Sequence, residues 1–293
     1  MNIQSPGRGP RFSSQAVGWS AVFGSAFCFY LATLIIRWAK PHVTIESAYF
    51  VFARLLLGFI VVSVVLILQK KSLHPKNYHY LIGRALANTL AVFCFYKAVE
   101  SGSVAEANIL NMTYPLFVAI FSWIFLRGQR DRLSLVIVAV AFAGVWLVLS
   151  PGEIQLGWGK LWGLSSGITA AVAVIYLNIS RRCHDSQTIL FFMFGLGTLL
   201  MLVFFHDAIF MPNPEELFFL LSCSIAGVLG QYLITYGFLY VTAVEGSIIS
   251  SSRILLAALL GPILVADPHL ALAGWCGALL IFAANATLAL RRA

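Results

Sequence analysis

The chain has 293 residues, of which 60% are hydrophobic and only 10% are charged. About a quarter of the residues are charged in soluble globular domains, so this composition excludes a soluble protein. The net charge of +8 does not call for nucleic acid as a partner, because its distribution along the chain matches membrane topology. Five cysteines, most of them inside apolar runs, are predicted to be core residues and neither disulfides nor metal ligands.

Ten apolar segments are long enough to cross a hydrocarbon core of about 30 Å at about 1.5 Å per residue. They lie at residues 16–36, 47–69, 79–99, 103–126, 133–150, 159–180, 187–206, 216–240, 246–266 and 270–290. The connections between them are too short to form a soluble domain. The sequence therefore predicts an all-α integral membrane protein with ten transmembrane helices that contacts lipid along most of its length.

The lysines and arginines predict the orientation, because cytoplasmic loops of membrane proteins carry an excess of them. With the N-terminus in the cytoplasm, 13 fall on the cytoplasmic side: Arg8, Arg11, Lys70, Lys71, Lys76, Arg84, Arg127, Arg130, Arg132, Arg181, Arg182, Arg291 and Arg292. Four fall on the other side, namely Arg37, Lys40, Lys97 and Lys160. We therefore expect both termini to be cytoplasmic, in a bacterial inner membrane.

The two halves of the chain align on each other without a gap at an offset of 139 residues. Gly18-Trp19 falls on Gly157-Trp158, and Ser103–Asn108 falls on Thr242–Ser247. Each period holds five spans, and a repeat with an odd number of crossings enters the membrane from the opposite side the second time. We expect repeats at 1–152 and 153–293 with inverted topology, the plan of many secondary transporters.

One sequence pattern raises the alternative of an enzyme. Residues Gly163–Gly167 match G-x-S-x-G, but that motif carries a nucleophile only at a strained strand-to-helix turn. Here it lies inside a predicted membrane helix, where small residues at four-residue spacing indicate close helix packing. No metal-binding or phosphate-binding motif accompanies it, so we predict no catalytic residue, no metal and no cofactor.

The helix at 103–126 carries Asn108, Asn111 and Pro115 at three- and four-residue spacing, which places them on one face. Pro115 crowds the carbonyl group of Asn111 and donates no hydrogen bond to it, so it predicts a kink. A freed carbonyl in lipid requires a neighbour, a water molecule or a ligand. The pattern, with Tyr114 beside it, indicates either a polar notch that binds substrate or a kink satisfied by a neighbouring helix.

The equivalent face of the helix at 246–266 carries Ser247, Ser250, Ser251 and Arg253. An arginine inside a span costs about 2.5–3.5 kcal/mol on insertion scales, so it is expected to have a function or a partner. It either faces a wet cavity, which we favour, or pairs with an acid for structural reasons. For Arg54, in a span with little other polar character, we expect a structural salt bridge.

Other polar and aromatic residues inside the spans are candidates for the wall of a cavity. They are Tyr30, Asn88, Tyr96, Trp162, Tyr232 and Tyr236. Tyrosine and tryptophan are also abundant at membrane interfaces, which is the alternative for those near helix ends.

The run Ala98–Ala107, followed by Tyr114-Pro115-Leu116-Phe117 and Ile124-Phe125-Leu126, resembles the signature of EamA repeats in the drug/metabolite transporter superfamily. The second copy ends Ala258-Leu259-Leu260-Gly261 and has Ile254 where the proline is usual. The resemblance implies a basket of ten helices around a cavity between the halves. Among family members, the chain is most similar to the YddG-type exporters of aromatic and other neutral amino acids.

We therefore predict a secondary carrier that exports small amphipathic metabolites, with neutral or aromatic amino acids as the expected class. A carrier of anionic metabolites is the first alternative, and it would place two or more cations in the cavity. A membrane-embedded enzyme and a non-transporting scaffold or sensor are further alternatives. A monomer is the favoured oligomeric state.

Overall fold

The computed structural model describes residues 11–125, 132–149, 157–181, 183–237, 240, 243–266 and 268–291. The described residues form helices and connections, with no strand among them. The helices are α1 (Arg11–Ala39), α2 (Ser47–Leu68), α3 (Tyr78–Ser101), α4 (Val104–Asn111), α5 (Tyr114–Phe125), α6 (Arg132–Leu149), α7 (Trp158–Ser180), α8 (Ser186–Phe204), the short 3-10 helix η1 (His206–Ala208), α9 (Pro214–Gly237), α10 (Ala243–Leu264) and α11 (Leu272–Arg291).

These helices make the ten predicted spans. Six described segments are long and apolar enough to cross a membrane, and three further apolar helices, at 136–148, 249–264 and 272–287, are shorter. The tenth span is α3, whose 24 residues are long enough but include Arg84, Asn88 and Lys97. Its lower hydropathy comes from polar residues, of which Arg84 and Asn88 prove to line a cavity.

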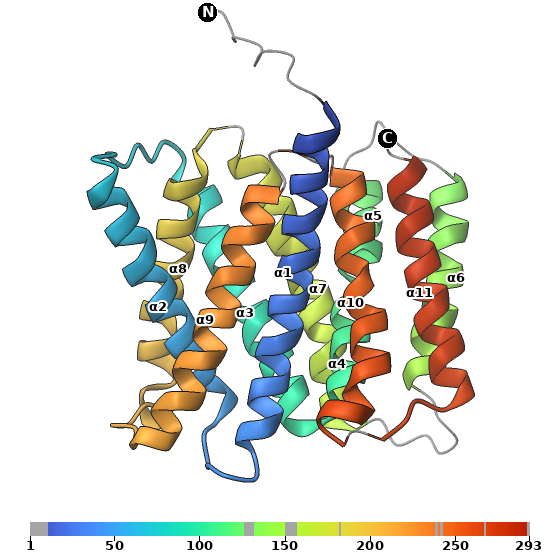
Figure 1. The fold of residues 1–293 in the computed structure, drawn as a ribbon. Helices are drawn as coiled ribbons and strands as arrows, with labels where there is room; N and C mark the ends of the chain where they lie inside the picture. The colour runs from blue at the N-terminus through green and yellow to red at the C-terminus, as the bar shows by residue number, and fades with distance from the viewer. Residues whose placement is uncertain are drawn as a thin grey trace, which may run out of the picture.

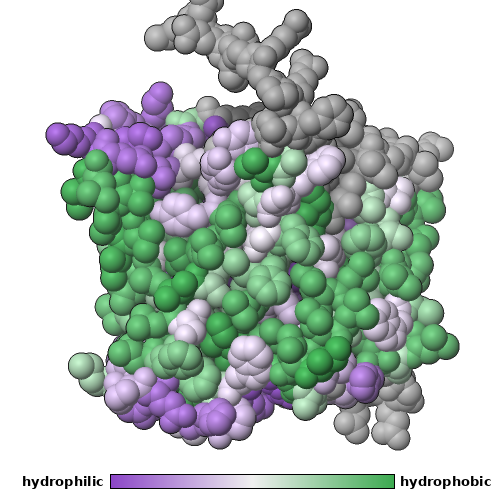
Figure 2. All heavy atoms as spheres, viewed as in Figure 1, coloured by the Kyte–Doolittle hydropathy of each residue, from purple (hydrophilic) through white to green (hydrophobic). Residues whose placement is uncertain are grey.

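The outer surface has the form that a bilayer requires. In Figure 2, hydrophobic residues cover the middle of the visible face, and hydrophilic residues gather at its two ends. The helices run roughly side by side between these ends, and α1 begins on the same side on which α11 ends (Figure 1). An even number of crossings requires this arrangement. We call this side the entry side, and we call the side with the α1–α2 connection the far side.

The main contacts between the two halves have counterparts when the halves are exchanged, with α1, α2, α3, α4/α5 and α6 equivalent to α7, α8, α9, α10 and α11. The contact of α3 with α7 corresponds to that of α1 with α9, and the contact of α4 and α5 with α7 corresponds to that of α1 with α10. Helix α2 contacts its own equivalent α8, and α6 contacts its own equivalent α11. This pattern is that of a pseudo-two-fold axis, as inverted repeats require.

The predicted kink at Pro115 is a complete break between α4 and α5. Helix α4 ends at Asn111, a turn follows, and α5 begins at Tyr114, so the proline occupies the first turn, where its missing N–H group costs least. Two carbonyl groups at the break accept hydrogen bonds from side chains: Asn285 donates to the Met112 carbonyl at 2.9 Å, and the Thr113 hydroxyl donates to the Leu110 carbonyl at 2.6 Å. Helix α7 packs closely here, because a Cβ atom at Gly167 would lie 2.8 Å from the Leu110 carbonyl oxygen.

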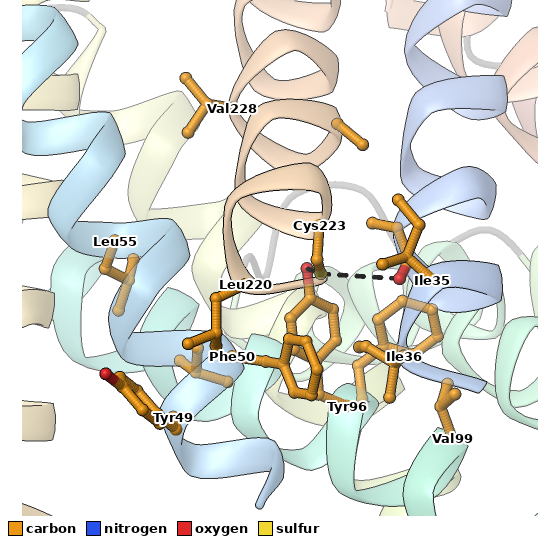
Figure 3. Close-up of a cluster of buried hydrophobic side chains, with 14 of the residues drawn as sticks. Ile35, Ile36, Tyr49, Phe50, Leu55, Tyr96, Val99, Leu220, Cys223 and Val228 are labelled. Carbon is orange, nitrogen blue, oxygen red and sulfur yellow. Dashed lines mark hydrogen bonds between the residues drawn. The ribbon is translucent and has the colours of Figure 1, made fainter. Parts of the chain in front are cut away.

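The far side is closed by a packed cluster of side chains, the far-side plug, formed by Ile35, Ile36, Phe50, Tyr96, Val99, Leu220 and Cys223. These residues come from the end of α1, the beginning of α2, the end of α3 and the beginning of α9. Figure 3 shows Tyr96, Cys223 and Ile35 pointing toward one another between these helices. Tyr96 is fully buried, and its hydroxyl oxygen lies 3.7 Å from the Cys223 sulfur.

Candidate functional site

A cavity of about 280 Å³ lies between the helices of the two halves. Its apolar wall includes Phe29, Phe95 and Met193, and four arginines line it: Arg54, Arg84, Arg181 and Arg253. The uncharged polar residues of the wall are Ser25, Asn88, Asn111, Tyr114, Ser186, Gln231, Thr235 and Ser250. The volume is close to the lower end of the range for ligand pockets, roughly 300–1,000 Å³, and indicates a small metabolite.

The cavity extends from the middle of the helices toward the entry side. Arg181 follows the end of α7 and Ser186 begins α8, and both side chains are partly exposed. In the opposite direction, Arg54 forms a hydrogen bond with Tyr96 of the far-side plug. The structure therefore has a cavity that reaches one side of the membrane and is separated from the other by packed side chains.

Among the described residues no carboxylate lines the cavity, so the charge of its described wall is strongly positive. The ion pairs of the described residues are elsewhere, for example Lys97–Glu100 and Lys160–Glu106. Arg54, Arg84 and Arg253 are only 5–6% exposed. Burying a charge without a counter-ion is unfavourable, so several such charges around one cavity indicate a place for an anion.

Arg253 extends from α10 and is held by the other half of the protein. Its Nη2 donates a hydrogen bond to Asn111 Oδ1, while Asn111 Nδ2 donates to the hydroxyl of Ser166 at 3.0 Å. Ser166 in turn donates to the Gly163 carbonyl at 2.6 Å. This chain of bonds fixes the amide of Asn111 with its oxygen toward the guanidinium group. The Nε of Arg253 has no partner in the described part of the chain.

Arg54 extends from α2 and is fixed by Tyr96 and by the space at Gly227. Its Nη1 donates to the Tyr96 hydroxyl at 3.0 Å, and its Nε has no partner among the described residues. A Cβ atom at Gly227 would lie 2.7 Å from both Cδ and Nε of Arg54, so only glycine leaves room for this rotamer. The expected salt bridge of Arg54 is therefore wrong: its partner is a phenol, and the arginine lines the cavity.

The aromatic ring of Phe29, on α1, contacts the guanidinium groups of both Arg54 and Arg253. The Cζ of Arg54 is 5.2 Å from the centre of its ring, and the Cζ of Arg253 is 5.9 Å from it. The ring of Phe95 is 5.1 Å from the Cζ of Arg253. Each such contact contributes about 0.5–2 kcal/mol, and the aromatic faces reduce the cost of holding two like charges close together.

Four of the predicted residues line the cavity: Asn88, Asn111, Tyr114 and Arg253. Tyr96 contacts it indirectly through Arg54. Asn108 does not reach it, because this side chain is fully buried and donates to the Thr33 hydroxyl at 3.3 Å and the Val104 carbonyl at 2.8 Å. The prediction that Asn108 binds substrate is therefore wrong, whereas Asn111 and Arg253 line the cavity and are in direct contact.

The remaining predicted residues lie outside the cavity wall. Ser251 accepts a hydrogen bond from Asn285 at 3.3 Å, Tyr30 is buried in the main hydrophobic core, and Trp162 packs edge-on against Phe93. Tyr232 packs against the same core. Tyr236 is 47% exposed and accepts a hydrogen bond from Tyr240, so it belongs to the outer surface. Ser247 lies outside the residues whose side chains are described.

Two cavity arginines, Arg84 and Arg181, were assigned by sequence only to the cytoplasmic flanks. A signal for Arg84 exists in the sequence, because Arg84, Asn88, Ala91 and Phe95 recur at intervals of three and four residues. Such spacing places them on one face of α3, and the structure aligns that face along the cavity. A basic residue near the end of a span is usually interpreted as one whose side chain snorkels to the membrane surface, so the helical spacing alone does not identify Arg84 as a cavity residue.

The comparisons with known proteins agree with this architecture. An uncharacterized transporter of Helicobacter pylori is 28% identical over 75% of this chain and 76% of its own length. The pseudopaline exporter CntI of Pseudomonas aeruginosa is 23% identical over 75% of this chain and 77% of its own. Mouse solute carrier family 35 member G1 is 24% identical over 72% of this chain and 61% of its own.

A solved crystal structure superposes with a TM-score of 0.61 over 97% of this chain and 99% of the other. At 16% identity, that likeness shows the fold alone. The model of the EamA-like transporter family matches the chain twice, at residues 16–150 and 157–290, which sets aside the enzyme alternative. The chain is thus a multi-pass membrane transporter of small molecules that belongs to the EamA-like transporter family, within the drug/metabolite transporter superfamily.

Proposed function

We propose that this protein is a secondary carrier that exports a small organic anion, with acid groups and an apolar part, across a bacterial inner membrane. The observation that carries the proposal is the lining of the cavity, which in the part of the chain that the structure describes has four arginines and no carboxylate. Guanidinium groups bind carboxylates and phosphates through parallel hydrogen bonds. The apolar wall, with Phe29 and Phe95, accommodates the remainder of the molecule.

This proposal moves away from neutral amino acids, the class expected from the sequence. That expectation counted one cation in the cavity, whereas the cavity has four. Neutral or aromatic amino acids remain the second candidate. Arg253 contacts Asn111 and lies beside the rings of Phe29 and Phe95. This arrangement suits a substrate with one carboxylate and an aromatic side chain. The resemblance to YddG-type exporters favours the same candidate.

The proposed orientation, with both termini in the cytoplasm, rests on the excess of lysine and arginine on one side of the membrane. This excess persists when Arg84, which lines the cavity, is left out of the count. In that orientation the cavity reaches the cytoplasmic side, as a carrier waiting for a substrate to export requires. A relative named as an exporter, the pseudopaline exporter, supports the outward direction.

Counterflow in proteoliposomes tests the proposal. Vesicles that contain the purified protein are loaded with unlabelled compound, and uptake of labelled adipate, glutarate, phosphoglycerate and phenylalanine is measured with and without a proton gradient. We expect the anions to exchange and phenylalanine to exchange poorly. Exchange of phenylalanine with no exchange of the dicarboxylates or phosphoglycerate would replace the proposal with the amino-acid candidate.

A further inference from the structure

We propose that the cavity has two separate anion subsites, so that its substrate carries two acid groups with an apolar segment between them. The deep subsite is formed by Arg54, Arg253 and Asn111. The second, which we call the entry subsite, is formed by Arg84, Arg181 and Asn88. This inference rests on the proposed function, since it assumes that the cavity binds an organic anion.

Arg84 is the main evidence for the entry subsite. Its side chain is only 5% exposed and lines the cavity, and no hydrogen bond or ion pair joins it to another described residue. The other two buried arginines each donate to an uncharged oxygen, from Tyr96 or from Asn111. A buried guanidinium group is stable only with a partner of opposite charge or with several acceptors. Arg84 faces the cavity without either.

Arg181 adds a second positive charge at the same place. It follows the C-terminus of α7 and lines the same cavity as Arg84, so the two positive charges repel each other across it. Two like charges held together destabilise the protein unless an anion lies between them. Asp185, the acidic residue at the start of α8, does not serve as that anion, because its carboxylate accepts from the Thr188 hydroxyl and from the N–H of Gln187 at 3.2 Å.

Asn88 completes the entry subsite. It lies one helical turn after Arg84 on the same face of α3 and also lines the cavity. Its amide supplies both a donor and an acceptor. The entry subsite thus offers two guanidinium groups and an amide, a donor set that suits a carboxylate or a phosphate.

On the sides formed by α3, α7 and α8, the wall between the two subsites is apolar, whereas α9 contributes the uncharged polar residues Gln231 and Thr235. Along α3, Arg84 at the entry side and Phe95 beside Arg253 are eleven residues apart, or about 16 Å along the axis. The α3 residues that line the cavity between Asn88 and Phe95 are Ala91 and Val92, and α7 and α8 contribute Val174, Leu190 and Met193. A small molecule with an acid group at each end therefore matches the distribution of charge along the cavity.

The test compares hexanoate with adipate, which differ by one terminal carboxylate. Binding to the purified full-length protein in detergent is measured by calorimetry, for the unaltered protein and for Arg84→Gln, Arg253→Gln and Arg37→Gln. Arg37 lies in the last turn of α1, outside the cavity, and serves as the matched control. Losing a charge-assisted hydrogen bond costs roughly 10- to 150-fold in affinity.

We expect adipate to bind more tightly than hexanoate. Arg84→Gln should weaken adipate at least about tenfold and leave hexanoate unchanged, whereas Arg253→Gln should weaken both. Arg84→Lys, which retains the charge, should recover part of the loss. Because Arg181 is partly exposed and its substitution perturbs packing least, Arg181→Gln repeats the test should Arg84→Gln not fold.

Equal affinity of adipate and hexanoate, or equal weakening of both by Arg84→Gln, would refute the entry subsite while leaving the organic-anion proposal in place. If neither acid binds and phenylalanine does, the proposed function itself fails. These two failures are therefore distinguishable.

Discussion

The two ends of the helix bundle are built from the same kinds of helix but have opposite character. At the far side, Ile35, Val99, Tyr96 and Cys223 pack into a plug without a charged group. At the entry side, Arg84 and Arg181 line a cavity that reaches the surface. The offset of 139 residues pairs Arg84 with Cys223, so the difference in charge between the two ends lies in the sequences of the two halves. The open and closed arrangements are what the pseudo-two-fold relation allows the two ends to exchange. A carrier with alternating access has to exchange the two arrangements.

The first prediction tests which end of the helix bundle faces the cytoplasm. The expected effect is the largest, because labelling of a cysteine from outside the cell is either present or absent. Met211 in the α8–α9 connection is 94% exposed at the far side, and Lys71 is exposed at the entry side. In a protein whose five cysteines are replaced, Met211→Cys in intact cells should react with an impermeant maleimide and Lys71→Cys should not. The reverse pattern would invert the orientation and with it the direction of transport.

The second prediction concerns the deep end of the cavity. Arg253→Lys should reduce substrate affinity roughly 10- to 150-fold, because lysine cannot reproduce two parallel hydrogen bonds to an acid group. Asn111→Ala should have a smaller effect in the same direction, since it removes the acceptor that orients Arg253. Counterflow and the melting temperature are measured together. A lysine variant with normal flux would show that Arg253 has only a structural role.

The third prediction separates a local displacement of Arg54 from general damage to α9. Gly227→Ala places a methyl group 2.7 Å from Arg54 Cδ and Nε, which has to move away from Tyr96. Because Arg54 is then displaced from the deep subsite, substrate affinity should fall about fivefold, which corresponds to about 1 kcal/mol. Stability should change little, since the far end of a long side chain can shift.

Gly24→Ala is the matched control for Gly227→Ala. Its Cβ atom would lie 3.5 Å from Leu233 Cδ1, an ordinary contact, so its affinity should not change. Equal effects of the two substitutions would mean that helix packing, and not Arg54, is responsible.

The last prediction concerns stability and not transport, namely how the entry side is held together. His184 is 8% exposed, its Nε2 accepts from the N–H of Lys76 at 3.1 Å, and its Nδ1 donates to the Ser180 carbonyl at 3.1 Å. It therefore links the α2–α3 connection of one half to the α7–α8 connection of the other. His184→Ala should lower the unfolding free energy by about 1–2 kcal/mol, measured as a lower melting temperature. His74, which is exposed and bonds only to Ser72, serves as control.

The sequence by itself determined the spans, the all-α class, a kink at Pro115 and the family, whereas the complete break between α4 and α5 appeared only in the structure. These features depend on local composition or on short motifs, because every backbone group in lipid has to be satisfied within its own helix. The offset of 139 residues also predicted that Asn111 and the Ser250–Arg253 face would correspond. The structure brings Asn111 and Arg253 into direct contact.

Only the tertiary structure decided which polar side chains share the cavity. Arg54, Arg84 and Arg253 are far apart in the chain. Each can be explained from its own helix without a cavity, as the partner of an acid in a salt bridge or as a basic residue that snorkels to the membrane surface. Hydropathy and helical period reveal that a residue is polar and which neighbours share its face, but not which helix that face meets. Tyr236 lies on the outer surface and Arg84 lies in the cavity because the pseudo-two-fold packing of the halves turns one face outward and the other inward.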